Sequence, residues 1–113
     1  MAKDIKQLLQ QYSEELYKIY GNHLKSVILY GSYARGDFNE DSDIDIMILL
    51  DITDTEIKKY RHLLSEVTYD FNMDHDIDIK PIAKAEEHFK KWVAAYPFYA
   101  NIISEGVNLY GAV

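Results

Sequence analysis

The sequence predicts a small α/β domain in which helices pack on a mixed β-sheet, and two patterns indicate this. Short apolar runs rich in β-branched residues alternate with longer segments whose apolar residues recur at helical spacing. Such alternation of strands and helices is typical of a sheet covered by helices. The length of 113 residues suits one domain, so we expect residues 1–113 to form a single domain.

The first part of the chain predicts two helices and two strands in alternation. The first helix ends at Gly21, and its apolar residues follow the helical period: Ile5, Leu8, Leu9, Tyr12, Leu16 and Ile19. Residues 25–30 form a short apolar run that ends at Gly31, which predicts a buried strand. Residues 32–36 allow a short helix, and residues 42–50 are predicted to form the second strand.

A further helix and a third strand follow. Residues 55–68 are predicted to be helical, with Thr55 or Asp54 as the N-terminal cap. The inward side of this helix is predicted to consist of Ile57, Leu63, Leu64 and Val67. Residues 75–82 are predicted to form a third strand that Pro81 closes.

The C-terminal part is predicted to be mainly helical. Residues 83–105 form this region, and Pro97 splits or kinks it, because proline cannot donate a backbone hydrogen bond and clashes with the preceding turn. Residues 105–111 are expected to close the chain as a short extended segment. The many aromatic residues of this region should cover the sheet, and any surplus could form a surface for a partner or for self-association.

Composition places the chain among ordinary soluble proteins. It is 48% hydrophobic and 27% charged, which allows a real core. No apolar run is long enough to span a bilayer, and the first ten residues lack a continuous apolar block, so we expect neither a membrane span nor a signal peptide. The chain has no cysteine, which excludes disulfides and thiolate chemistry and fits a cytoplasmic location.

The charge is acidic and unevenly distributed. A formal charge of −7, from 19 acidic and 12 basic residues, argues against stable binding to nucleic acid, which needs a basic surface. Seven acidic residues lie within residues 37–54, and no Lys or Arg lies among them. Such a cluster repels itself unless solvent or a cation neutralises it, and a solvated loop is the usual interpretation.

Aspartates alternate with isoleucines in the second and third predicted strands. Because side chains alternate across a strand, Asp43 and Asp45 share one face about 7 Å apart, and Asp76 and Asp78 repeat the arrangement. If these strands pair, the carboxylates converge at a cost on the order of 1 kcal/mol per pair. A divalent cation offsets this repulsion, and oxygen ligands without His or Cys favour Mg²⁺ or Mn²⁺.

Two other interpretations account for part of this pattern. Residues 37–48 begin like an EF-hand loop, but Ser42 occupies its sixth position and Ile48 its twelfth, where Gly and Glu are required, so we reject this motif. Alternating aspartates also suit the solvent-facing side of ordinary half-exposed strands. The strands alone leave this second alternative open.

The Gly31-Ser32 pair follows the first predicted strand. A strand-to-helix junction directs free backbone N–H groups beyond the strand end, where phosphate binds readily. Glycine lets the backbone approach a ligand closely, and serine adds a hydroxyl donor. A plain turn with a serine helix cap is the common alternative. Phosphate donors and metal-binding carboxylates on consecutive elements are what nucleotide chemistry requires.

Gly31-Ser32, ten intervening residues and Asp43-Ile44-Asp45 together resemble the signature of the polymerase-β-type nucleotidyltransferase superfamily. The stretch is most similar to the minimal nucleotidyltransferases (MNT), many of which act as antitoxins beside HEPN-domain toxins. The resemblance covers most of the chain, including the first helix, the third strand with its aspartate and the final extended segment. It implies a polymerase-β-like nucleotidyltransferase fold.

The resemblance also implies a set of metal ligands. Asp43 and Asp45 would hold two Mg²⁺ ions, with Mn²⁺ as the alternative, and Asp78 would help to bind one of them and serve as the candidate general base. Asp78 is preferred to Asp76 because it has the apolar-Asp-apolar form of the family, although Asp76 lies on the same predicted face. Lys80 falls on this face too, and we expect it to face solvent or form a salt bridge.

The resemblance assigns the nucleotide to the other half of the motif. Gly31 and Ser32 would hold the β- and γ-phosphates of a nucleoside triphosphate. Arg35 matches an arginine of the family motif and could contact phosphate. Neutralisation of Asp37 or Asp41 at the surface is the equally weighted alternative for this arginine.

The implied function is a Mg²⁺-dependent transfer of a nucleoside monophosphate, most commonly AMP from ATP, to an acceptor hydroxyl. The chain shows no extra helical substrate domain after about residue 110 and no toxin motif, so a HEPN toxin modified on tyrosine is the expected acceptor and this chain the antitoxin. The alternative is a non-catalytic antitoxin that neutralises its partner by contact. A single-stranded nucleic-acid polymerase accessory is disfavoured by the missing basic groove.

Overall fold

A computed structural model describes residues 2–111 of the chain. The first elements are helix α1 (Ala2–Tyr20), the short 3₁₀ helix η1 (Gly21–His23), strand β1 (Leu24–Tyr30), helix α2 (Ser32–Arg35) and strand β2 (Ile44–Leu50). The later elements are helices α3 (Asp54–Lys59) and α4 (Arg61–His75), strand β3 (Ile79–Ala85), helices α5 (Glu86–Trp92) and α6 (Pro97–Glu105) and strand β4 (Val107–Gly111).

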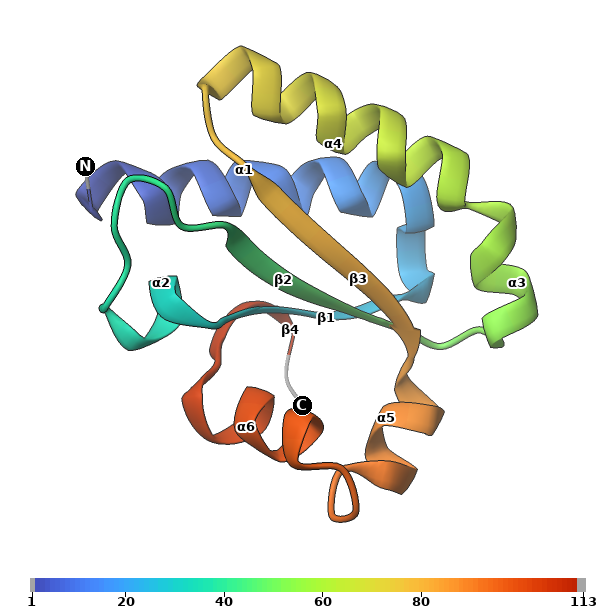
Figure 1. Cartoon of the computed structure of the whole chain (residues 1–113). Coiled ribbons are helices and arrows are strands. Elements are labelled where there is room, and N and C mark those ends of the chain that lie inside the picture. The colour runs from blue at the N-terminus through green and yellow to red at the C-terminus, as the bar shows by residue number, and fades with distance from the viewer. Residues whose placement is uncertain (1, 112–113) are drawn as a thin grey trace.

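The strands form one mixed sheet in the order β3-β2-β1-β4 (Figure 1). Strand β1 is antiparallel to both of its neighbours, β2 and β4. Strands β2 and β3 are parallel, because helices α3 and α4 form the crossover connection that parallel neighbours need. The predicted fold class, a small mixed sheet with helices packed on it, is confirmed.

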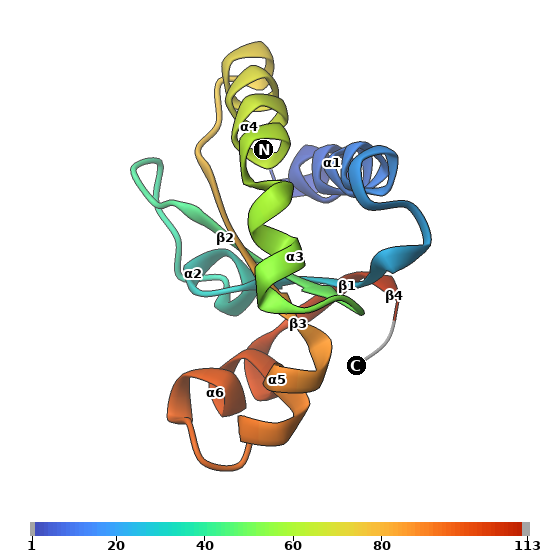
Figure 2. The same ribbon diagram turned by 90° about the vertical axis from the view of Figure 1, so that its right-hand side faces the viewer.

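Helices cover both faces of this sheet. Figure 2 shows α1 and α4 on one side of the strands, with α5 and α6 on the other. The central strand β2 is consequently buried on both faces, and residues 46–50 are all 0% exposed. Burial on both faces explains why this strand is a continuous apolar run after Asp45.

The core has two parts, one on each face of the sheet. The part beneath α1 and α4 contains Leu9, Tyr12, Leu16, Tyr20, Leu24, Val27, Leu29, Ile44, Ile46, Ile48, Leu50, Phe71, Ile79 and Leu109. A buried hydrogen bond of 2.7 Å between the hydroxyls of Tyr12 and Thr68 joins α1 to α4 within this part. The part beneath α5 and α6 contains Ile28, Met47, Leu49, Phe89, Tyr99 and Ile102.

The predicted helix over residues 55–68 differs from the structure in three ways. It is divided into α3 and α4 at Tyr60, and α4 continues to His75. The N-terminal cap is Thr53, whose hydroxyl accepts a hydrogen bond of 3.2 Å from the N–H of Glu56. Leu63 is 49% exposed, because the inward side of α4 carries Leu64, Thr68 and Phe71 at helical spacing. The predictions for the cap and for Leu63 were therefore wrong.

The third strand begins later and ends later than predicted. Helix α4 extends to His75, and Asp76 ends that helix in the left-handed conformation with φ of 53°. Strand β3 then begins at Ile79 and passes through Pro81, which the sheet accommodates because β3 is an edge strand. The prediction that Asp76 lies on this strand and that Pro81 closes it was wrong.

The C-terminal region agrees more closely with its prediction. Pro97 lies in the first turn of α6, where its missing N–H costs little, and it separates α6 from α5 as expected. The final extended segment is strand β4, which pairs with β1. Within residues 2–111, no helix combines the length and the apolar character that crossing a bilayer requires.

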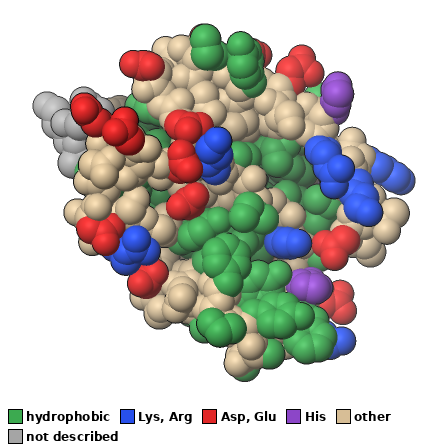
Figure 3. Space-filling model, in the orientation of Figure 1, with side chains coloured by type: hydrophobic (Ala, Val, Ile, Leu, Met, Phe, Trp, Pro, Cys, Tyr) green, Lys and Arg blue, Asp and Glu red, His purple; other side chains and the backbone are tan. Residues whose placement is uncertain are grey.

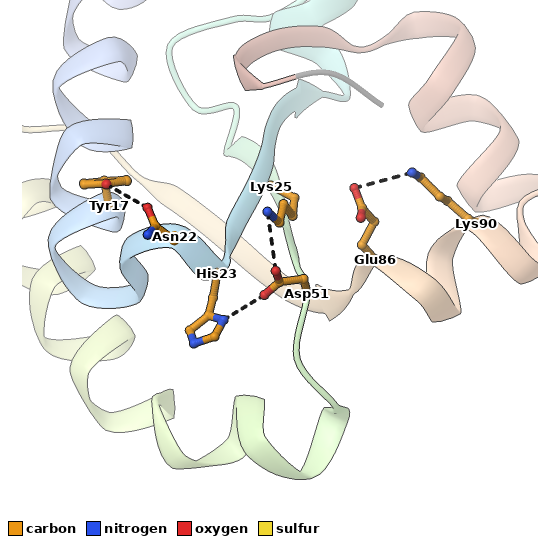
Figure 4. A network of polar contacts seen from close by, with 7 residues as sticks. All are labelled: Tyr17, Asn22, His23, Lys25, Asp51, Glu86 and Lys90. Atoms are coloured by element: carbon orange, nitrogen blue, oxygen red, sulfur yellow. Dashed lines mark hydrogen bonds and ion pairs between the residues drawn. The ribbon is translucent and has the colours of Figure 1, made fainter.

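Paired charges occupy the end of the sheet where β1 begins and β2 ends (Figure 4). Asp51 accepts a 2.8 Å hydrogen bond at the His23 ring and lies 3.4 Å from the ammonium of Lys25. The His23 and Lys25 interactions hold the pKa of the Asp51 carboxyl below its ordinary value. Gly31 and the first residues of β2 lie at the opposite end of the same strands, where the acidic residues are less completely paired.

Candidate active site

The turn between β1 and α2 requires glycine at its first position. Gly31 has φ of 76°, a conformation that L side chains rarely adopt. Its carbonyl accepts hydrogen bonds of 3.1 Å from both Ala34 and Arg35, which fixes the turn. A Cβ added at Gly31 would collide with Oδ2 of Asp45. The Asp45 carboxylate therefore packs directly against the backbone of this turn.

Ser32 opens the single turn of helix α2 between two glycines. Its carbonyl accepts hydrogen bonds from the N–H groups of Gly36 at 2.9 Å and Asp37 at 3.1 Å. Gly36 ends α2 in the left-handed conformation with φ of 85°. The structure thus places Ser32, as predicted, at the point where the chain leaves β1 next to Asp45.

Asp43 and Asp45 lie at the start of β2. Asp45 is partly buried and pairs in register with Tyr30 of β1, whereas Asp43 is exposed and immediately precedes the strand. Alternating side chains place both carboxylates on the face of the sheet that carries α5 and α6. Burial raises the pKa of Asp45, the nearby Asp43 raises it further, and Arg35 lowers it. The two carboxylates therefore repel one another, and a cation between them would remove that repulsion.

Asp78 lies beside Asp43 at the neighbouring strand end. Its carbonyl accepts a 2.9 Å hydrogen bond from the N–H of Ile44. The parallel register pairs Asp45 with Lys80, so Asp78 falls on the same face as Asp43. The Asp78 carboxylate lies 3.7 Å from the Lys80 ammonium, and both side chains are 58% exposed.

Asn72 of α4 fixes the start of β3. Its side-chain oxygen accepts a 2.9 Å hydrogen bond from the N–H of Ile79, and its side-chain nitrogen donates one of 3.3 Å to the carbonyl of the same residue. Both backbone groups of Ile79 on this side are therefore bound to one amide. This pairing holds the residue that follows Asp78 and thereby limits where the Asp78 carboxylate can lie.

Asp76 occupies a different position from Asp78. It is the C-terminal cap of α4, and its N–H donates to the carbonyl of Asn72. Asp76 and Asp78 line the same cavity of about 590 Å³, so strand pairing and not the cavity distinguishes them. Of the two aspartates considered from the sequence, Asp78 is thus the one held next to Asp43 by strand pairing.

The donor set on this face suits a hard divalent cation. Asp43, Asp45 and Asp78 supply carboxylate oxygens from two adjacent strands. Oxygen donors without sulfur or imidazole are the ligands that Mg²⁺ and Mn²⁺ prefer. Within residues 2–111, no three acidic or histidine side chains lie close enough together to hold an ion as they stand. A cation shared by all three would require these carboxylates to move closer together.

Arg35 lies at the end of α2 and is engaged by two carboxylates. Its guanidinium lies 3.2 Å from Asp37 and 3.6 Å from Glu105, and all three side chains are well exposed. Asp37 is one of the two partners expected from the sequence, and Glu105 at the end of α6 is an addition. The positive charge of Arg35 also lowers the pKa of Asp45, against the larger effects of burial and Asp43 that raise it.

Two residues of this region were missed by reasoning from the sequence. Asn72 gave no signal, because it lies between the predicted helix, which ended at residue 68, and the predicted strand, which began at residue 75. Tyr30 directly precedes Gly31 and pairs with Asp45, so strand pairing could have identified it. Burial and the nearby Asp45 charge raise the pKa of Tyr30 to about 12.

Comparison with known proteins identifies the class to which this fold and site belong. Residues 3–112 match the family described as "Polymerase beta, Nucleotidyltransferase". The chain belongs to this family and is therefore a nucleotidyltransferase enzyme by class. This membership agrees with the resemblance noted in the sequence and with the polymerase-β-like fold.

Two relatives come from Methanocaldococcus jannaschii, and both carry the provisional name protein adenylyltransferase. The first is 35% identical over 103 residues, which cover 90% of this chain and 94% of the relative. The second is 32% identical over 79 residues, which cover 70% of this chain and 78% of the relative. The similarity to the first relative thus extends over nearly the whole of both chains.

Solved structures with the same fold come from toxin–antitoxin pairs. A chain of a toxin–antitoxin complex with AMP-PNP is 20% identical, with a TM-score of 0.58, and the match covers 91% of this chain and 73% of that one. A chain of the complex between a tri-AMPylated Shewanella oneidensis HEPN toxin and an MNT antitoxin is 19% identical, with a TM-score of 0.53 and 95% and 73% coverage. At these identities the likeness establishes the fold alone.

Proposed function

We propose that this protein transfers AMP from ATP to a hydroxyl group of another protein and acts as the antitoxin of a HEPN toxin. The relatives with the name protein adenylyltransferase support a protein acceptor. The MNT antitoxin that shares the fold, in complex with a tri-AMPylated HEPN toxin, supports a HEPN partner. A tyrosine acceptor is proposed on the family resemblance of the sequence. The observation that carries the proposal is the packing of the Gly31 turn against Asp45, with Asp43 and Asp78 at adjacent strand ends.

The proposed roles follow from these positions. Gly31 and Ser32 bind the β- and γ-phosphates through backbone N–H groups and the serine hydroxyl. Asp43, Asp45 and Asp78 would hold two Mg²⁺ ions, or Mn²⁺ in their place, which when bound neutralise the triphosphate and promote ionisation of the acceptor hydroxyl. Electrostatic stabilisation of this kind is commonly the largest contribution to phosphoryl-group chemistry.

The transfer step uses Asp78 as the proton acceptor. The acceptor oxygen forms a bond to the α-phosphorus while the bond to pyrophosphate breaks, and the carboxylate of Asp78 takes the hydroxyl proton. Arg35 is proposed as a phosphate contact. Its partners Asp37 and Glu105 are exposed carboxylates, so exchanging them for a phosphate costs little.

A non-catalytic antitoxin is the competing function. The observation that favours it is the contact between Asp78 and Lys80, together with the separation of the acidic side chains within the described residues 2–111. We further propose that residues 1–113 form one nucleotidyltransferase domain acting in the cytoplasm, which the absence of cysteine supports. The net charge of −7 is the reason that stable nucleic-acid binding forms no part of the proposal.

Intact-mass spectrometry of the partner tests this function. The purified protein is incubated with Mg²⁺, each nucleoside triphosphate in turn, and a HEPN protein encoded in a neighbouring reading frame. A mass gain of one or more nucleoside monophosphates is expected, and the Asp43→Asn, Asp45→Asn double variant should abolish it. The control Asp70→Asn alters an exposed aspartate on α4 and should retain the gain. Tight partner binding without any mass gain, unchanged in the double variant, would instead establish the contact-only antitoxin.

A further inference from the structure

A cavity of about 470 Å³ lies between helix α4 and the outer edge of strand β3. Asn72 and Asp78 line it at the start of β3, and Arg61 lines it at the other end of α4. Strand β3 is the edge strand, so within residues 2–111 no further strand separates this cavity from the Asp43 and Asp45 face. The cavity therefore reaches the candidate general base from the outer edge of the sheet.

One side of α4 forms a wall of this cavity. The lining residues Arg61, Ser65, Thr68 and Asn72 follow one another at intervals of three or four positions, so they form a stripe along the helix. Arg61 and Asn72 are eleven residues apart, which is about 17 Å at the helical rise. An extended chain covers this distance in about five residues. The stripe therefore has the length of a short peptide segment.

The outer edge of β3 is poorly suited to pairing with a further strand. The side-chain amide of Asn72 bonds both backbone groups of Ile79, so these groups face outward. Backbone groups alternate in direction along a strand, so those of Pro81 face outward too, and proline has no N–H to donate. A segment in this cavity is therefore held by its side chains and not by a β-ladder.

Arg61 brings an unbalanced positive charge to the cavity. Of the three charged residues in the lining, Lys80 and Asp78 pair with one another. Arg61 forms no ion pair with a carboxylate of the described part of the chain. It lies in the first turn of α4, which contains no acidic residue and where a positive charge opposes the helix dipole. The stability of the helix therefore does not explain this arginine.

Two lysines extend the positive surface beside Arg61. Lys58 and Lys59 are exposed at the end of α3, and neither pairs with a described carboxylate. Figure 3 shows Lys and Arg side chains gathered over α3 and the start of α4, with hydrophobic side chains between them and the acidic group. Lysines at the end of a helix also stabilise it, so Arg61 is the more specific of the three charges.

We propose that this cavity binds the acceptor segment of the partner protein in extended form, with an acidic side chain at Arg61 and the acceptor hydroxyl at Asp78. The inference rests on the proposed function, which supplies a protein acceptor and assigns Asp78 as the base. The length of the stripe sets the spacing, so the acidic residue lies about five positions from the modified one. A net charge of −7 repels a polyanion such as RNA, whereas one carboxylate suits one unpaired arginine.

Synthetic peptides test both the charge and the spacing. Each peptide contains one tyrosine in a neutral sequence, with Glu, Gln or Lys five positions before or after it. The transfer of AMP from ATP in Mg²⁺, followed by mass spectrometry, gives a KM for each peptide. In one of the two directions, we expect the Glu peptide to have a KM about threefold below that of the Gln peptide, the effect of one exposed ion pair. The Lys peptide should have the highest KM.

Arg61→Glu should invert this order, so that the Lys peptide becomes the better acceptor. Glutamate suits the first turn of a helix, so this variant should fold at least as well as the wild type. The control Lys6→Glu changes the net charge equally at an exposed lysine of α1 outside the cavity, and it should keep the wild-type order. Ser65→Trp obstructs the middle of the stripe and should raise the KM for every peptide without changing ATP binding in calorimetry.

Several results would overturn the inference. One is an equal KM for the Glu, Gln and Lys peptides in the wild type, and another is an unchanged order in Arg61→Glu. If the wild type modifies the HEPN protein but no peptide, equal rates on that protein for Arg61→Glu and Lys6→Glu would overturn it as well. Binding of a single-stranded RNA oligonucleotide that Arg61→Glu abolishes, with no preference among the peptides, would assign the positive surface to nucleic acid instead.

Fluorescence anisotropy of labelled peptides in Mg²⁺ and ATP separates this inference from the proposed function. A preference for binding the Glu peptide that Arg61→Glu removes, without AMP transfer to any acceptor, would leave the docking cavity standing and remove the transferase. AMP transfer that does not depend on Arg61 would remove the docking cavity alone. A wild type that neither binds the peptides nor transfers AMP to any acceptor would overturn both.

Discussion

At the scale of single residues, the site depends on contacts between the Gly31 turn and the start of β2. The carboxylate of Asp45 occupies the space that a side chain at Gly31 would need. The same carboxylate is partly desolvated and lies near a second negative charge. The backbone conformation at Gly31 and the position of the Asp45 charge therefore depend on one another. Substitutions at Gly31 and at Asp45 can test the two contributions separately.

Replacing Gly31 by alanine should affect activity more than stability. Gly36 is in the left-handed helical region, so Gly36→Ala should lose about 1–2 kcal/mol of unfolding free energy. Gly31 has φ of 76° and ψ of −156°, a region almost restricted to glycine, so Gly31→Ala should lose about 1–3 kcal/mol. Only at Gly31 does the new methyl group meet Asp45, because nothing lies within 4 Å of a Cβ at Gly36. Denaturant unfolding should therefore show a loss of stability in both variants, and kcat/KM for AMP transfer should fall at Gly31 alone. Equal activities in the two variants would contradict the proposed contact.

Neutralising Asp45 should abolish transfer without destabilising the metal-free protein. The pKa of Asp45 is raised above the ordinary value of 3.8, so the folded state disfavours the charged carboxylate. The resulting loss of folding stability develops as the pH rises above 3.8 and the carboxyl ionises. At neutral pH, Asp45→Asn should therefore match or exceed the wild type, by up to about 0.5 kcal/mol. Thermal unfolding in EDTA measures this difference, and Asp70→Asn serves as the control.

Added Mg²⁺ gives the complementary result for the same variant. Binding to the folded state raises the unfolding temperature of the wild type, whereas Asp45→Asn should respond much less. A variant that is stabilised by Mg²⁺ as strongly as the wild type would show that Asp45 does not bind the ion.

At the scale of elements, the start of β3 decides where the third carboxylate lies. Helix α4 runs on to His75 and uses Asp76 as its cap, so only Asp78 remains to precede the strand. The hydrogen bond from Ile44 and the two bonds from Asn72 then hold the strand start from both sides. A residue of helix α4 thereby positions a candidate catalytic group, because Asn72 binds the backbone of the residue that follows Asp78.

Removing the Asn72 amide should loosen the β3 end of the site. Asn72→Ala leaves both groups of Ile79 without their side-chain partner and should cost about 1–2 kcal/mol of stability. It should also lower kcat for transfer while leaving the KM for ATP nearly unchanged, because Gly31 and Asp45 are not disturbed. Asn72→Asp keeps one acceptor and should retain part of the rate. Asn101→Ala, at an exposed position on α6, should change neither quantity.

At the scale of the whole molecule, the two ends of the sheet differ in charge balance. One end holds Asp43, Asp45 and Asp78. Partial burial and the nearby Asp43 raise the pKa of Asp45 there. The other end holds Asp51 between His23 and Lys25 (Figure 4). Three carboxylates gather at the first end, where a cation is proposed to bind and where Lys80 pairs with Asp78, whereas at the second end His23 and Lys25 both pair with the single carboxylate of Asp51.

The pairing of Asp51 with His23 and Lys25 should contribute a small stabilisation that is lost in acid. The pKa of Asp51 is lowered from its ordinary value of 3.8, so the stabilisation is present above that value and disappears as the pH falls through the lowered pKa. Asp51→Asn should lower Tm by about 2 °C at neutral pH, and the difference should vanish in acid. A series of thermal scans across pH measures it, and a constant difference at every pH would exclude this cause.

Local pattern accounts for most of what could be predicted. Apolar periodicity and the glycines were sufficient for the helices α1 and α2 and the strands β1 and β2. The spacing from Gly31 to Asp45 was sufficient for the nucleotidyltransferase family, since each of these features lies within one element or one turn. Errors occurred where the chain could continue one element or begin another, at Tyr60 and at Asp76.

The sequence by itself determined the fold class, the family and the placement of Gly31, Ser32, Asp43 and Asp45 at consecutive strand ends, because alternation and turn geometry are local properties of the chain. Only the tertiary structure decided that Asp78 and not Asp76 lies beside Asp43. It also decided that Asn72 holds the start of β3 and that Arg35 pairs with Glu105 at the end of α6. These arrangements join residues from different elements, and they depend on how far α4 extends and on which face α6 packs, which no local pattern records.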